Sequence, residues 1–163
     1  MSKAFTRESD FELESRPLPR RPLSARENNP ITAAGAQRFE AELVQLIERR
    51  RGTDLSAPET VSLQTRIRQL QEILQSAVIA VLPADRTRIA FGANVQIRYA
   101  NGEQAWLQIV GVDESDPEHD KISWQSPLAR ELMGRQVGEE FRFRAPAGDQ
   151  KLQILAVSYP ATT

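Results

Sequence analysis

The sequence has 163 residues, of which 40% are hydrophobic and 26% charged, as is typical of a soluble globular protein. Its 21 basic and 22 acidic residues leave a net charge of -1, so no excess of positive charge favours binding to nucleic-acid phosphates. Cysteine is absent and His119 is the only histidine, which excludes thiol chemistry, histidine-based triads and multi-histidine metal sites. No apolar run resembles a signal peptide or a membrane span, and we expect a cytoplasmic protein.

Residues 1–29 mix charges of both signs with the proline-rich sequence RPLPRRPL. The prolines interrupt any continuous helix, and the few apolar residues have no regular spacing. We therefore predict a flexible tail. Its arginines, Arg16, Arg20 and Arg21, could contact an acidic partner.

Residues 30–82 show helical spacing of apolar residues in two blocks separated by about eight residues, a distance that favours antiparallel neighbours. The apolar positions are Ala36, Phe39, Leu43 and Leu46 in the first block, and Leu63, Ile67, Leu70, Leu74 and Ala77 in the second. Such narrow seams, flanked by charged residues, suit two helices packed against each other. We predict an antiparallel coiled-coil hairpin with arms about 28 Å long.

Residues 83–163 change to the alternating spacing of β-strands. The segments NVQIRY and AWLQIVGV enclose Asn101-Gly102, a strong β-hairpin pattern. Three further strands are predicted at KISW, EEFRFRAP and KLQILAVSY. Trp106 and Trp124 lie on these strands, and we expect both in the core.

A short helix is predicted between the third and fourth of these strands. Ser126 is a favourable N-cap residue, Pro127 occupies the preferred first position, and Gly134 can end the helix. The second part of the chain is therefore an antiparallel β domain with one short helix. Together with the helical hairpin, it defines an α+β fold.

The predicted turn between the two long helices reads RRRGTDLSAPETVSL. Ser56 and Glu59 have the spacing of a capping box, in which the glutamate side chain bonds to the backbone at the helix start. Asp54 can satisfy turn amides through its side chain. The three arginines, 49–51, end the first helix, where cations interact favourably with the helix dipole.

The segment ISWQSPLARELMGRQVGEEFRFRAPAG resembles the C-terminal domain of the bacterial Gre family, the transcript-cleavage factors GreA and GreB of RNA polymerase. The matching positions are Ile122, Ser123, Ser126, Pro127, Ala129, Leu132, Gly134, Arg135, Val137, Gly138, Glu139, Pro146 and Gly148. IAFGANVQI and IVGVDESD are similar to the family's entry strand and acidic loop. PITAAGAQRFEAEL and RIRQLQEILQSAVIAV resemble the two ends of its hairpin, so the resemblance covers about residues 30 to 160.

This resemblance implies an FKBP-like C-terminal domain that docks at the rim of the secondary channel of RNA polymerase, while the coiled coil enters the channel. The positions implied for docking are Asp113, Glu114, Ser126, Pro127, Leu128, Ala129, Arg130 and Gly134. In the family, two acids at the hairpin tip help to hold a Mg²⁺ ion at the polymerase active site. We expect a monomer that is not itself an enzyme, has no cofactor of its own beyond this shared Mg²⁺, and binds neither specific nucleic-acid sequences nor membranes.

The tip departs from the family pattern. Asp54 matches the first acid, but Ala57 stands where the second is expected, and Glu59 lies two residues further on. Each arm is also shorter than in the family by about three turns, or about 16 Å. A tip that far back would not reach a metal ion coordinated at about 2 Å. We therefore expect polymerase binding that modulates elongation or initiation without efficient transcript cleavage.

Three alternatives remain. The first is a working cleavage factor that uses Asp54 and Glu59. The second is a prolyl isomerase, because the C-terminal domain is FKBP-like by resemblance. The third is a regulator outside transcript cleavage, similar to the short-armed Gre paralogue that acts on nucleoside diphosphate kinase.

Overall fold

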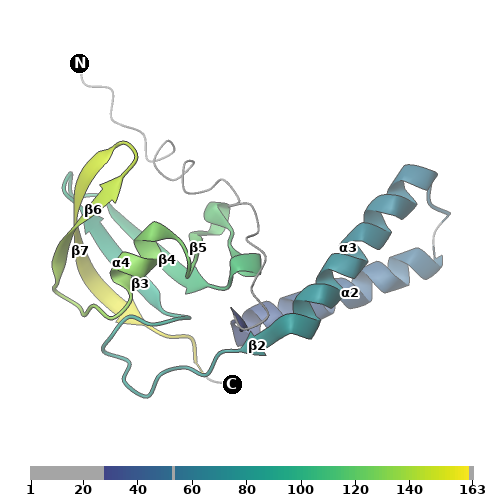
Figure 1. Cartoon of the computed structure of the whole chain (residues 1–163), viewed down its shortest axis with the longest axis horizontal. Coiled ribbons are helices and arrows are strands. Elements are labelled where there is room, and N and C mark those ends of the chain that lie inside the picture. Colours follow the sequence, from purple (N-terminus) through teal and green to yellow (C-terminus); the bar gives the residue numbers. More distant parts are fainter. Residues whose placement is uncertain (1–27, 53, 162–163) are drawn as a thin grey trace. The chain divides into compact units, whose positions relative to one another are not determined.

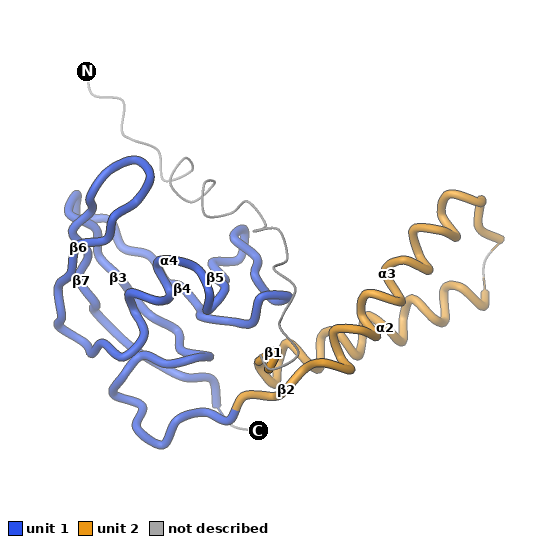
Figure 2. Tube along the Cα trace, in the orientation of Figure 1, with its two compact units in different colours: residues 1–23, 81–163 blue, residues 24–80 orange. Residues whose placement is uncertain are grey.

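The computed structural model describes residues 28–52 and 54–161. The predicted flexible tail therefore falls almost wholly outside the described residues. The chain divides into two compact units, and the boundary between them lies between Ala80 and Val81 (Figure 2). Of the described residues, we call 28–80 the hairpin unit and 81–161 the β unit.

Two helices of 20 residues each form the hairpin unit, α2 (Ala33–Gly52) and α3 (Ala57–Ser76) (Figure 1). At 1.5 Å per residue each is about 30 Å long, close to the predicted arm. The hydroxyl oxygen of Thr32 accepts a hydrogen bond from the Gly35 amide at 2.9 Å and so caps the start of α2. The helices are joined by residues 53–56, a shorter connection than the predicted eight residues.

The seam between α2 and α3 is close to the predicted one. Phe39, Leu70 and Ile73 form its buried centre, and Leu43, Leu46 and Leu74 pack against them. The prediction correctly included Leu74 but omitted Ile73, which is only 2% exposed. The difference arises because a helix has 3.6 residues per turn, so a strict alternation of three and four drifts away from the contact line.

A short two-stranded parallel sheet, which was not predicted, closes the base of the hairpin. β1 (Asn29–Ile31) pairs with β2 (Ala77–Ile79) in the register Asn29 to Ala77. The Ala80 amide extends this ladder by donating to the Ile31 carbonyl at 3.0 Å. The predicted last seam residue, Ala77, consequently belongs to a strand rather than to α3.

All five predicted strands are present in the β unit and form one sheet in the order β5-β4-β3-β7-β6. Their bounds are β3 (Asn94–Tyr99), β4 (Gln104–Val110), β5 (Lys121–Ser123), β6 (Glu140–Ala145) and β7 (Gly148–Ser158). This arrangement confirms the α+β class. The prediction of a purely antiparallel sheet needs one correction, because β5 pairs in parallel with β4 after residues 111–120 return the chain.

The predicted Asn101-Gly102 turn connects β3 to β4. The Tyr99 amide donates to the Glu103 carbonyl at 2.8 Å, which closes a three-residue loop. Gly102 has a φ of 89°, the left-handed conformation that the last residue of such a loop requires.

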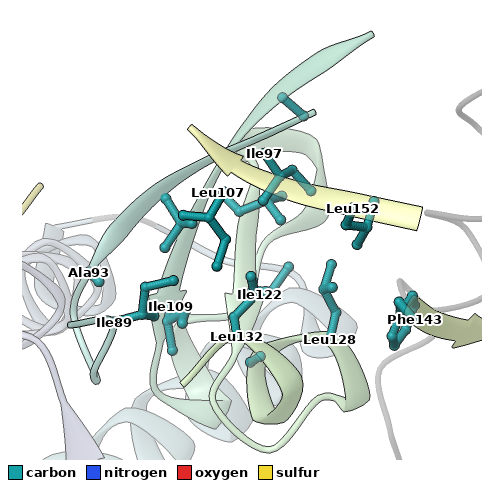
Figure 3. Close-up of a cluster of buried hydrophobic side chains, with 14 of the residues drawn as sticks. Ile89, Ala93, Ile97, Leu107, Ile109, Ile122, Leu128, Leu132, Phe143 and Leu152 are labelled. Atoms are coloured by element: carbon teal, nitrogen blue, oxygen red, sulfur yellow. The ribbon is translucent and has the colours of Figure 1, made fainter. Parts of the chain in front are cut away.

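One apolar core fills the β unit beneath α4 (Pro127–Leu132). Figure 3 shows Ile97, Leu107 and Leu152 of the strands on the same cluster as Leu128 and Leu132 of α4. The strands contribute alternate residues to this core, as their spacing predicted.

The two tryptophans differ in burial. Trp124 packs against the core as expected. The prediction of a buried Trp106 is wrong, because Trp106 is 46% exposed. Its neighbours Ala105 and Leu107 are both buried. Alternation along β4 therefore directs Trp106 to the outward face of the sheet.

Candidate functional site

The hairpin tip consists of the end of α2, the connection, and the start of α3. Arg49, Arg50 and Arg51 occupy the last turn of α2, and all three are exposed. Asp54 follows them and is also exposed. Arg51 makes an ion pair with Glu48 at 3.2 Å on the helix surface, a contact of small energetic value. The tip therefore presents three arginines and three acids, Glu48, Asp54 and Glu59, to solvent.

Glu59 is occupied in capping α3. Its Oε2 atom accepts hydrogen bonds from the Ser56 hydroxyl at 2.6 Å and from the Ser56 amide at 3.1 Å. These two bonds lower the pKa of Glu59 below its ordinary value of 4.5, the hydroxyl bond having the larger effect. The capping role predicted for this residue is thus confirmed.

The tip offers a cation few free oxygen ligands. Ala57, at the position of the second family acid, is the first residue of α3 and supplies only a methyl group. Among residues 28–52 and 54–161, no three acidic, histidine or cysteine side chains gather closely enough to hold a metal ion. The two bonds from Ser56 engage one carboxylate oxygen of Glu59 and hold its side chain against the start of α3.

A bidentate ion pair joins the two arms midway along the hairpin. The Nε and Nη2 atoms of Arg66 donate to the two carboxylate oxygens of Glu42 at 2.7 and 2.9 Å. Arginine and carboxylate match in this geometry, which fixes the register of one helix against the other. The arms are therefore held in one alignment by the apolar seam and by this pair.

The residues implied for docking around α4 divide into supporting and exposed positions. Ser126 is buried, and its hydroxyl oxygen accepts the Ala129 amide at 3.2 Å as the predicted N-cap. Leu128 and Ala129 belong to the core. Of the implied positions around α4, Pro127, Arg130 and Gly134 are the exposed ones.

The acidic loop, residues 113–120, is partly internal. Glu114 is only 3% exposed, and its carboxylate accepts the Gly111 amide at 2.9 Å, which braces the first 3-10 turn, η1 (Val112–Glu114). Asp113 is half-buried. In the second turn, η2 (Pro117–His119), His119 lies 2.7 Å from the carboxylate of Asp116. Glu114 is therefore a structural residue of the loop.

Trp106, expected in the core, is a further residue that the sequence reasoning assigned to the wrong environment. Its exposed ring could have been foreseen, because AWL places it between two small or aliphatic residues that face the core.

A helical hairpin with a capped tip, followed in the chain by a small β domain, defines a protein whose candidate site lies at the turn of the hairpin. The family model for the C-terminal domain of the transcription elongation factors GreA and GreB matches residues 84–159. The chain is 34% identical to GreB of Pseudomonas aeruginosa, over 80% of this chain and 90% of the relative. It is 36% identical to GreA of Acidiphilium cryptum, over 80% of this chain and 97% of the relative. The chain belongs to the GreA/GreB family of transcription elongation factors.

Solved structures give a weaker match. The crystal structure of GreA factor homolog 1 of Thermus thermophilus has a TM-score of 0.41 and 24% identity, covering 81% of this chain and 99% of that one. In the part of the chain that the structure describes, no helix has the length and apolar character needed to cross a bilayer.

Proposed function

We propose that this protein binds bacterial RNA polymerase at its secondary channel and modulates transcription without efficient stimulation of transcript cleavage. The observation that carries the proposal is the chemistry of the tip, where one exposed acid, Asp54, stands alone beside a glutamate committed to capping. The family to which the chain belongs supports the choice of polymerase as partner.

Cleavage by the family mechanism would require the tip to complete a two-metal site. In such a site two metal ions stabilise the attacking and the leaving oxygen. Each ion must itself be held by hard oxygen ligands at about 2 Å. Here Ala57 removes one carboxylate, and the hydrogen bonds from Ser56 that lower the pKa of Glu59 hold its side chain against the helix start. Asp54 by itself supplies one ligand to the polymerase, which is a weak basis for catalysis.

Arm length supports the same conclusion. The alignment with the Pseudomonas GreB runs over 151 positions but includes 80% of this chain's 163 residues, or about 130. About 21 aligned positions therefore have no counterpart in this chain. Two arms that are each three turns shorter would lack about 22 residues, since one turn is 3.6 residues. A hairpin of that length would occupy the channel while its tip stopped short of the metal ions.

The exposed part of the α4 region is the surface we assign to docking. Pro127, Arg130 and Gly134 are exposed on the β unit, and the residues Leu128, Ala129 and Leu132 between them are anchored in its core. Arg130 is the charged member and can pair with acidic residues of the polymerase. A charge reversal there should weaken binding while leaving the core unchanged.

A backtracked elongation complex tests the proposal directly. With Mg²⁺ and saturating protein we expect stable binding, but no faster shortening of the transcript than in the absence of the protein. Arg130→Glu should weaken binding, whereas Arg142→Glu, at an exposed position on β6, should not. Efficient cleavage that Asp54→Ala abolishes would show that the protein is a cleavage factor instead. Failure of the wild type to bind the polymerase would favour a partner outside transcription.

The variant Ala57→Glu separates the two reasons for the lack of cleavage. If arm length limits the reaction, restoring an acid at this position will not restore cleavage. If only the missing carboxylate limits it, this single change will be sufficient, and the argument from arm length is then wrong.

A further inference from the structure

A shallow hollow of about 350 Å³ lies on the outward face of the β unit. Its walls come from β3, β4, the end of β7 and the η2 turn. The lining residues are Asn94, Trp106, Leu107, Gln108, His119, Asp120 and Ser158. The hollow is on a different element from α4 and is not used in the proposed docking to polymerase.

Trp106 makes this hollow unusual for a solvated sheet face. The exposed indole offers a flat apolar surface, and its cross-strand partner is the polar Gln96. His119, with a side chain 70% exposed, provides a second ring in the lining. Aromatic rings next to polar groups form the type of groove that binds extended proline-rich segments.

The charge around the hollow is negative. Asp120 lines it, Asp116 contacts the ring of His119, and Glu118 is exposed between them. Lys121 is the one basic residue that follows in this stretch, and it is half-buried. A ligand that combines prolines with positive charge would therefore complement both the rings and the rim.

The chain itself contains such a sequence. Residues 16–26, RPLPRRPLSAR, hold four arginines and no acid, and they include the P-x-x-P motif of Pro19 to Pro22. We propose that residues 16–22 of the N-terminal segment bind in the hollow beside Trp106, with prolines against the aromatic rings and arginines facing the acidic rim.

The point of attachment favours binding within one molecule. The segment joins the described chain at Asn28, and the next residue, Asn29, pairs with Ala77. Ala77 is only four residues before Val81, where the β unit begins. Because a short tether raises the effective concentration of a ligand at its site, a sequence of modest affinity is sufficient.

A spin label near the motif tests this proposal on the full chain. The protein has no cysteine, so Leu18→Cys gives a single attachment site for a nitroxide. The chain has only two tryptophans, which give two indole N–H signals, one from Trp106 and one from Trp124 in the core. We expect the nitroxide to abolish most of the Trp106 signal and to affect the Trp124 signal less. Chemical reduction of the nitroxide should restore the Trp106 signal.

Two matched variants separate the contributions. Reversing charge with Arg20→Glu and Arg21→Glu, or removing the motif with Pro19→Ala and Pro22→Ala, should each restore most of the Trp106 signal. A nitroxide at Ser2→Cys, outside the motif, should leave that signal stronger than the label at position 18 does.

Two outcomes would overturn the proposal. Equal Trp106 signals with the labels at positions 2 and 18 would show that the motif does not occupy the hollow. Broadening of equal size in a mixture of spin-labelled protein and separate ¹⁵N-labelled protein would assign the occupant to a second copy. Neither result bears on polymerase binding, so this proposal can fail while the proposed function stands.

Discussion

Truncation of Leu70 should show that the hairpin unit and the β unit unfold independently of each other. Leu70 is fully buried in the seam of the hairpin unit, where it packs with Phe39 and Ile73. Leu70→Ala removes three carbon atoms from this cluster. At about 0.8 kcal/mol per buried methylene the transfer cost is about 2.4 kcal/mol, and a residual cavity raises the total to about 3 kcal/mol.

Two spectroscopic probes report separately on the two units. Helical circular dichroism comes mainly from α2 and α3, with 20 residues each, because α4 has only 6. Fluorescence comes from Trp106 and Trp124, both in the β unit. With a urea dependence of about 1 kcal/mol per M for a small unit, Leu70→Ala should lower the midpoint of the helical transition by about 3 M, or unfold the hairpin without urea.

The fluorescence transition of the same variant should stay where it is in the wild type. Val61→Ala is the matched control, because Val61 is on the same helix and 63% exposed, so its truncation creates no cavity. Equal shifts of both transitions in Leu70→Ala would show that the two units unfold together. An unchanged helical transition would show that the seam contributes little, and either result would refute the reasoning.

Three further changes test local features. Ser126→Ala removes the acceptor for the Ala129 amide and should lower the free energy of unfolding of the β unit by about 1 kcal/mol. Urea denaturation followed by fluorescence measures this, and an unchanged stability would show that the cap does not stabilise the unit. Gly134→Ala should cost about 1 to 2 kcal/mol in the same assay, because Gly134 has a φ of 86° while a Cβ there meets no atom within 4 Å. Glu59→Gln should flatten the acid dependence of hairpin stability: the folded pKa of Glu59 is lowered, so its contribution is present above pH 4.5 and lost as pH falls through the folded pKa. Helical melts at falling pH measure this, and parallel losses in variant and wild type would contradict the capping role.

Much of the tip could be predicted because capping is a local property. Ser56 and Glu59 are three residues apart, and one helical turn brings their polar groups together whatever the rest of the chain does. The same holds for Ser126 at the start of α4. The seam was predictable for a similar reason, since the period of Phe39 and Leu70 in their helices fixes which face is apolar.

Burial of individual candidate residues was less predictable. Glu114 and Asp113 are adjacent acids in the sequence, yet only Glu114 turns inward to bond the Gly111 amide. Leu128 and Ala129 likewise lie on the face of α4 that packs into the core, not on its exposed surface. These outcomes depend on which side of a turn or helix meets the sheet, and no local pattern specifies that contact.

The sequence by itself determined the hairpin, its capped tip, the five strands and the family, because each depends on periodicity or on residues close together along the chain. Only the tertiary structure decided the β1–β2 pairing at the base, the parallel β5, the burial of Ile73 and the grouping of Trp106 with His119 and Asp120 around the hollow. Those features join segments up to 48 residues apart, such as Asn29 and Ala77, and long-range contacts are chosen by packing of the whole unit rather than by local preference.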